Sequence, residues 1–143
     1  MRLKIELVPK STWSWNVRSE VTSTRWDQIR RGVYAKANYL CEICGGKGSK
    51  HPVECHEKWQ YDDTTHVQTL VGLEALCPKC HMVRHIGLTF HRGLGHVALA
   101  HLVKVNNISL DDAEKMVETA FTKWAARSTH EWKLDLSWLS QVR

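Results

Sequence analysis

The spacing of four cysteines constrains this chain more than any other feature of its sequence. Two C-x2-C pairs, Cys41–Cys44 and Cys77–Cys80, are separated by the 32 residues from 45 to 76. A two-residue spacer curls the backbone so that both thiolates of a pair reach one tetrahedral ion at about 2.3 Å. We therefore predict that these four cysteines bind one structural Zn²⁺, which would stabilise a small fold.

Length and composition favour a metal site over disulfide bonds. The chain has 143 residues, enough for a single domain over residues 1–143. It contains neither the roughly 20 consecutive apolar residues of a membrane span nor the apolar stretch of a signal peptide, so we expect a cytoplasmic protein that makes no membrane contact. Disulfides are rare in the cytoplasm, and the number of cysteines, five, is odd.

Alternating hydrophobic residues predict strands at the two ends of the chain. Residues 3–7 alternate apolar and polar side chains, and residues 132–139 do the same, so the last strand could pair with the first. Between them we expect a zinc core at about 26–90 and a C-terminal helical extension at about 93–128. The expected fold class is α+β.

Helical spacing of apolar residues predicts three longer helices. The first covers about Arg25–Ala37, with Ser23 or Thr24 as its N-cap. A buried helix is expected at Val97–Val105. The strongest helical pattern follows Ser109, which is a good N-cap residue and precedes acidic side chains in the first turn.

Positive charge is concentrated in one segment. The whole chain carries a formal net charge of +5, and residues 75–110 contain four lysines and arginines but no carboxylate. Such a segment favours an anionic partner such as a phosphate backbone. Lys79, Arg84 and Arg92 are the candidate contacts.

A second cluster of metal-ligand residues surrounds the fifth cysteine. The segment Pro52–Trp59 can form a short strand, which would place Glu54 and His56 on one face and Cys55 and Glu57 on the other.

Two further histidines follow the second cysteine pair. His81 and His85 are four residues apart, so on a helix that begins near Pro78 they share a face and can bind one ion. Cys80 would point about 100° away, toward the zinc.

The residues from about Trp26 to Phe90 resemble the HNH (His-Me finger, ββα-metal) endonuclease family, in the subgroup built on a zinc-bound treble clef. The matching pattern is a helix, Cys41-x2-Cys44, a strand that carries a histidine, and Leu76-Cys77-x2-Cys80-His81-x3-His85. More loosely, the whole chain resembles small stand-alone bacterial HNH endonucleases. With the terminal strands, the resemblance implies a small zinc-stabilised treble-clef/ββα-metal core with flanking helices and a short terminal strand pair.

The resemblance also implies a role for each residue of the second cluster. His56 matches the general base that deprotonates a water molecule. Cys55 takes the place of the first residue of the family's His-His or Asp-His pair, which binds a divalent ion together with side chains of the following helix, here His81 and His85. That ion would bind the scissile phosphate and stabilise the leaving oxygen.

Two positions depart from the family pattern, and they leave the identity of the second metal ion undecided. Cys55 replaces a histidine or aspartate, and the family's central asparagine falls on Gly72. A thiolate with two imidazoles forms a softer site than Mg²⁺ prefers, so Mn²⁺, Ni²⁺ or Zn²⁺ fits as well. Alternatively, Glu54 or Glu57 supplies an oxygen ligand, and Glu57 beside His56 would complete a site suited to Mg²⁺.

These patterns give two functional hypotheses. The first is a metal-dependent endonuclease that hydrolyses phosphodiester bonds of double-stranded DNA, with His56 and Glu57 as its catalytic residues. The alternative is a non-catalytic treble-clef zinc module that binds nucleic acid or a protein partner, in which Cys55 and Gly72 mark a lost active site.

Overall fold

A computed structural model describes residues 2–142, and its centre is an antiparallel hairpin followed directly by a helix. The described residues form these elements in chain order: η1 (Lys10–Thr12), α1 (Val17–Glu20), α2 (Ser23–Lys36), β1 (Glu54–Asp62), β2 (Val67–Leu76), α3 (Pro78–Arg84), α4 (Ile86–His91), α5 (Gly95–Asn106), α6 (Leu110–Arg127), β3 (Lys133–Asp135) and η2 (Ser137–Gln141). The expected α+β class is confirmed.

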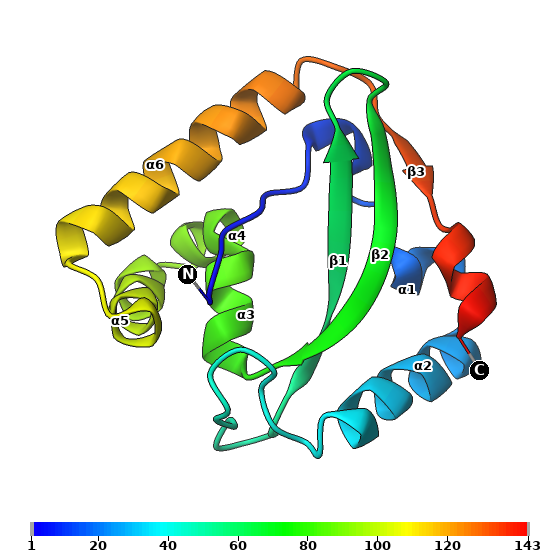
Figure 1. Cartoon of the computed structure of the whole chain (residues 1–143), viewed down its shortest axis with the longest axis horizontal. Helices are drawn as coiled ribbons and strands as arrows, with labels where there is room; N and C mark the ends of the chain where they lie inside the picture. The colour runs from blue at the N-terminus through cyan, green and yellow to red at the C-terminus, as the bar shows by residue number, and fades with distance from the viewer. Residues whose placement is uncertain (1, 143) are drawn as a thin grey trace.

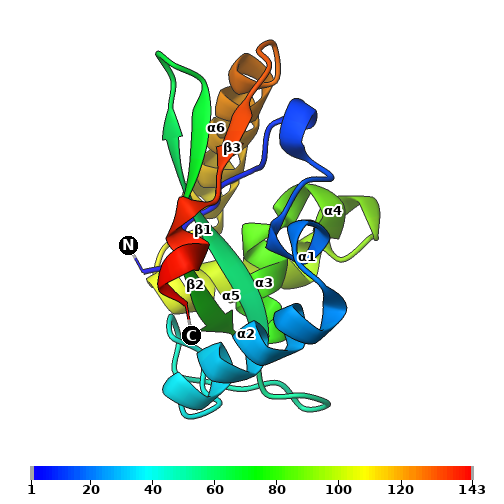
Figure 2. The ribbon, with the colours of Figure 1, turned by 90° about the vertical axis from the view of Figure 1, so that its right-hand side faces the viewer.

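Helices cover both sides of the hairpin. In Figure 1, α3 to α6 lie on one side of β1 and β2, and α1 and α2 lie on the other. Figure 2 shows the same arrangement after a quarter turn, and in both views the loop that joins α2 to β1 lies at the end of the hairpin opposite its turn. β2 ends and α3 begins at this same end of the hairpin. The loop carries the first cysteine pair, and the second pair lies at the junction of β2 and α3, so the two pairs lie side by side.

The register of the hairpin fixes which side chains share a face. Glu54 pairs with Leu76 and His56 with Glu74, and the register shifts by one residue between Lys58 and Trp59. Paired residues in an antiparallel sheet point to the same face. Glu54, His56 and Glu74 therefore all face α3.

Buried apolar side chains form one core between the helices and the end of β2. It contains these residues: Leu3, Cys41, Leu76, Cys77, Cys80, Val83, Ile86, Ala98, Leu102, Val105, Ala113 and Val117. Cysteines of both pairs belong to this set, so the cysteine pairs and the apolar core form one structural unit.

The expected pairing of the two terminal strands is wrong. Leu3 is fully buried, but its backbone N–H and C=O bond the side chain of Asn106 in α5, and residues 3–7 form no strand. The alternating pattern thus reflects side-chain burial without a partner strand. The C-terminal strand is shorter than expected, covers Lys133–Asp135 and runs parallel to β2 from Val67 to Thr69. It ends where Asp135 accepts hydrogen bonds from the backbone and hydroxyl of Ser137, which begins η2.

The predicted helices are present with small changes in their ends. α2 begins at Ser23, and its cap is Thr22, whose hydroxyl accepts from the backbone N–H of Arg25, so the cap lies one residue before the expected positions. The cap of α6 is Ser109 as predicted, and it accepts from the backbone N–H of Asp112. The expected helix at 97–105 is α5, and its C-cap, Asn107, has the left-handed conformation.

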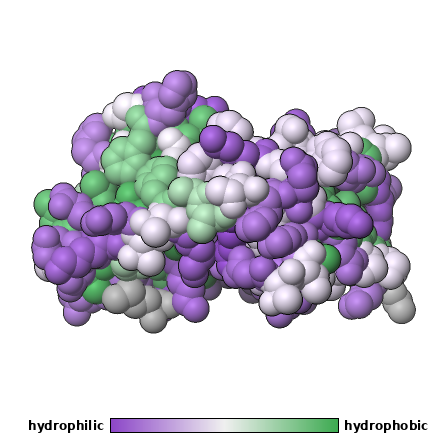
Figure 3. Space-filling model, turned by 90° about the horizontal axis from the view of Figure 1, so that it is seen from above, coloured by the Kyte–Doolittle hydropathy of each residue, from purple (hydrophilic) through white to green (hydrophobic). Residues whose placement is uncertain are grey.

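The surface seen from the turn of the hairpin is mostly polar. Figure 3 shows hydrophilic side chains over most of this face, with one hydrophobic patch on its left-hand part. None of the helices in residues 2–142 combines the length and the apolar character needed to cross a membrane.

Candidate metal centres

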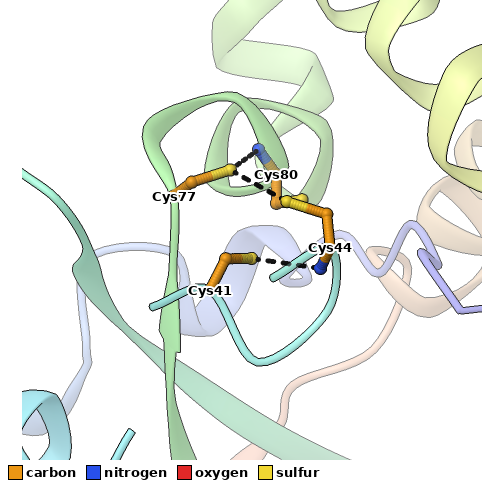
Figure 4. Close-up of side chains that lie close together, drawn as sticks. All are labelled: Cys41, Cys44, Cys77 and Cys80. Carbon is orange, nitrogen blue, oxygen red and sulfur yellow. Dashed lines mark hydrogen bonds between the residues drawn. The ribbon is translucent and has the colours of Figure 1, made fainter. Parts of the chain in front are cut away.

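The four cysteines of the two C-x2-C pairs converge at one point. Cys41 and Cys44 come from the loop after α2, Cys77 follows β2, and Cys80 lies in the first turn of α3. Their Sγ atoms all lie within 4.8 Å of one another, and those of Cys44 and Cys77 are 3.7 Å apart. Figure 4 shows the four side chains pointing toward one another. The expected cysteine cluster is confirmed, and its geometry can hold a metal ion.

Backbone contacts fold the first pair into a tight turn. The N–H of Cys44 lies 3.5 Å from Sγ of Cys41, and the N–H of Gly46 lies 3.4 Å from Sγ of Cys44. Gly45 takes a φ of 74°, the left-handed region that glycine enters without a Cβ penalty. The turn is held against β2 because the N–H of Glu42 donates to the carbonyl of Ala75 at 2.9 Å.

The thiols of the cluster ionise unequally. Hydrogen bonding from Cys80 lowers the pKa of the Cys41 thiol to about 4, and the same contact raises the pKa of Cys80. Burial raises the pKa of Cys77 to about 11. Without an ion, the thiols therefore share negative charge unequally, whereas a bound divalent ion allows all four to ionise and ligate.

Three histidines form a second cluster on the α3 face of the hairpin. His56 comes from β1, His81 from α3, and His85 directly follows α3. The ring centroids are 5.2 Å apart for His56 and His81, 5.1 Å for His56 and His85, and 4.7 Å for His81 and His85. One ring nitrogen from each lies within 4.8 Å of the others. The expected grouping of these three side chains is confirmed.

Burial keeps two of these histidines uncharged. Burial and the neighbouring His85 and His81 lower the pKa of His56 to about 2, and burial and His81 lower the pKa of His85 to about 4. Both rings are therefore neutral near neutral pH, which is the form that binds metal or accepts a proton. His56 is 9% exposed, and its buried Nδ1 has no hydrogen-bond partner.

A carboxylate orients the cluster from the side. Nδ1 of His81 donates to Oε1 of Glu54 at 2.9 Å, and Nε2 of His51 donates to Oε2 of the same carboxylate at 2.9 Å. The bond to His81 is the main reason that the pKa of Glu54 falls to about 2. A carboxylate on one imidazole nitrogen fixes the ring and leaves its other nitrogen for a metal ion. The sequence placed Glu54 on the correct face, but it gave no sign of His51.

Cys55 and Glu57 point away from the histidines. The expectation that Cys55 binds the second metal ion is therefore wrong. The alternation of β1 turns Cys55 toward α2, where burial raises the pKa of its thiol to about 12. Glu57 accepts a hydrogen bond from the backbone N–H of Val17, the first residue of α1, at 2.9 Å. Burial raises the pKa of the Glu57 carboxyl group. The structure therefore shows these side chains in packing and capping contacts.

Gly72, which falls where the family has its central asparagine, lies against the side chain of Lys58. A Cβ built on Gly72 would lie 2.9 Å from Cε of Lys58, its partner in the hairpin. Gly72 thus makes room for Lys58, and no amide group is present at this position.

One of the three expected nucleic-acid contacts is used inside the protein. Nη2 of Arg84 donates to Oε1 of the buried Glu74 at 3.1 Å, and Nη1 donates to the carbonyl of Lys4. The side chain of Arg84 is only 12% exposed, so the prediction that it contacts nucleic acid at the surface is wrong. Arg84 instead holds α3 against β2. Lys79 and Arg92 are exposed as expected.

His101 of α5 joins the cysteine cluster without any sequence signal. Its Nε2 lies 3.1 Å from Sγ of Cys80, within hydrogen-bond distance. Such a contact can stabilise a thiolate and orient it toward an ion.

Comparisons of the chain with protein-family models, curated proteins and solved structures found no match. The function is therefore inferred from the geometry of the two clusters.

Proposed function

We propose that this protein is a metal-dependent endonuclease that hydrolyses phosphodiester bonds of double-stranded DNA. The observation that carries the proposal is the convergence of His56, from the first strand of a hairpin, with His81 and His85 at the following helix. A strand histidine facing two helix histidines is the arrangement that the resemblance to HNH endonucleases implies.

The histidine cluster fits a divalent ion on chemical grounds. Two rings are neutral near neutral pH, the third is held by Glu54, and the buried Nδ1 of His56 has no partner. His81 and His85 would hold the ion, and imidazole ligands suit Zn²⁺ or Ni²⁺. Such an ion supplies Lewis-acid stabilisation of the negative charge that develops on a phosphate.

His56 is assigned the proton transfer. Its neutral ring can accept a proton from a water molecule, and its centroid lies 5.2 and 5.1 Å from those of His81 and His85, which would hold the ion. Glu54 acts as a positioning residue because it holds His81 through Nδ1. Glu57 has no part in this proposal, since its carboxylate contacts α1.

The four-cysteine cluster is assigned a structural role as a Zn²⁺ site. Four thiolates in tetrahedral reach of one point are typical of closed structural sites, in which no position is left for a substrate. A zinc ion there would hold the loop after α2 against the start of α3, and α3 carries His81.

The decisive experiment is a nicking assay on supercoiled plasmid with added Mg²⁺, Mn²⁺, Ni²⁺ or Zn²⁺. His56→Ala is expected to lower the rate about 10²- to 10⁴-fold, the usual contribution of a general base. His91→Ala is the matched control, because His91 is exposed at the end of α4. Cutting by His56→Ala at the wild-type rate would remove His56 from the mechanism.

A non-catalytic zinc module is the second candidate, and one observation favours it. His56 is 9% exposed, so a water molecule and a phosphate have little access to it in this conformation. Under this alternative the three histidines bind a second structural ion. Absence of cutting with every metal, together with retained DNA binding and two bound ions per chain, would select it.

A further inference from the structure

A basic groove lies next to the cysteine cluster, and its lining does not include His56, His81 or His85. It has a volume of about 610 Å³ and lies between the loop after α2, the start of α3, the end of α5 and the N-terminal segment. Five of its lining residues are lysines or arginines: Arg2, Lys47, Lys50, Lys79 and Lys104. Among residues 2–142, no carboxylate lines it.

The fold holds these cations in place from four separate segments. The guanidinium of Arg2 donates to the carbonyls of Ile43 and Val105 at 3.2 and 3.0 Å, so it joins the loop to α5. The loop approaches α3 so closely that a Cβ built on Gly48 would lie 2.8 Å from Cδ of Pro78. This close contact brings Lys47 to the same groove as the helical lysines.

The five cations of the groove are all exposed to solvent. Within residues 2–142, none of the five groove cations takes part in an ion pair. Their positive potential is therefore directed at solvent.

The positive charge exceeds what the cysteine cluster needs. A divalent ion bound by four thiolates carries a formal charge of −2. Five cations leave a surplus of three positive charges around it. Cations spread over a groove of this size, without a carboxylate between them, match a chain of phosphates better than a single anion.

The groove also connects to the histidine cluster. His51 lines the groove, and it donates to Glu54, which in turn accepts from His81. A phosphate backbone lying in the groove would therefore run up to the edge of the proposed catalytic centre.

We propose that this groove binds the phosphate backbone of double-stranded DNA and holds the duplex beside the histidine cluster. The choice of DNA rests on the proposed function, whereas the groove itself is argued from its own residues. Contacts to phosphate fix position without reading sequence, so the groove supplies affinity and register.

The test measures binding of a short fluorescent DNA duplex to protein that carries His56→Ala, so that no cutting occurs. Adding Lys79→Ala and Lys104→Ala is expected to weaken binding at least tenfold. It should also reduce the slope of log affinity against log salt concentration by about two, one for each phosphate contact. The control replaces Lys115 and Lys123 of α6, which removes the same charge from residues outside the groove, and it should change binding less than twofold.

Several outcomes would refute the proposal that this groove binds DNA. Equal losses in the groove and α6 variants would mean that only net charge matters. Unchanged DNA affinity with a lower zinc content in the groove variant would mean that the lysines merely balance the thiolates. Tighter binding of an RNA duplex would reject DNA as the partner. Because binding is measured without cutting, a protein that binds through the groove but never cuts leaves this inference intact and refutes the nuclease.

Discussion

Replacing Arg84 by methionine should destabilise the protein by about 3–5 kcal/mol. The side chains of Arg84 and Glu74 are only 12% and 7% exposed, and Nη2 of Arg84 lies 3.1 Å from Oε1 of Glu74. Removing one partner of a buried ion pair leaves an uncompensated charge, and this cost is typically 3–5 kcal/mol. For a chain of this length the loss corresponds to a fall in melting temperature of about 10–17 °C. Urea and thermal unfolding followed by circular dichroism in zinc-containing buffer measure it.

The double variant Arg84→Met with Glu74→Gln is the control, since it removes both charges. It should recover most of the lost stability, to within about 1–2 kcal/mol of the wild type. A loss below about 1 kcal/mol in the single variant would refute the reasoning, because Glu74 would then be solvated or neutral in the native protein.

The pH dependence of the single variant adds an independent check. Burial raises the pKa of Glu74, and Arg84 lowers it, so loss of Arg84 raises that pKa further. Above the unfolded pKa of about 4.5, the folded variant then binds a proton that the unfolded chain does not. Its stability therefore falls as pH rises from the unfolded pKa through the folded pKa of Glu74, so the variant should lose less stability near the unfolded pKa of about 4.5 than well above it.

Three further changes test the clusters and the loop between them. Cys77→Ser should remove one zinc ion per chain and much of the helical circular dichroism signal, because the bound ion stabilises the fold; full retention of both would contradict a structural site. Glu54→Gln should weaken metal binding at the histidines about 10- to 100-fold in calorimetric titrations, whereas Glu57→Gln should not, and equal effects would reject Glu54 as the positioning carboxylate. Gly48→Ala should destabilise the chain by about 1–3 kcal/mol in urea unfolding, because the added Cβ meets backbone and Pro side-chain atoms. Gly32→Ala, at an open position in α2, should instead stabilise by about 0.5–1 kcal/mol, and the same sign for both would refute the steric argument.

The parts of the site that local pattern determines could be predicted from the sequence. The C-x2-C spacing fixes how each cysteine pair turns, and strand alternation places Glu54 and His56 on one face. Helical periodicity likewise brings His81 and His85 together. In each case the geometry depends on residues within about one turn of helix or a few residues of strand.

The parts that depend on distant segments could not be predicted in this way. Alternation in residues 3–7 shows which side chains are buried, but the hydrogen-bond partner is Asn106, more than 100 positions away. The contact between His101 and Cys80 and the ion pair between Arg84 and Glu74 also depend on how α5 and α3 pack. Charge counting alone therefore misassigned Arg84 to the surface.

The position of the two cysteine pairs has a consequence for the unfolded chain. Cys44 and Cys77 are 33 positions apart, and the entire β1–β2 hairpin lies between them. A metal ion that joins the pairs closes this segment into a loop, much as a disulfide would, and the loss of chain entropy for such a loop amounts to about 4 kcal/mol at 25 °C. The hairpin would then form inside a closed loop with its two ends already together. Zinc binding would thereby lower the entropic cost of bringing His56 to the helix, in addition to stabilising the final structure.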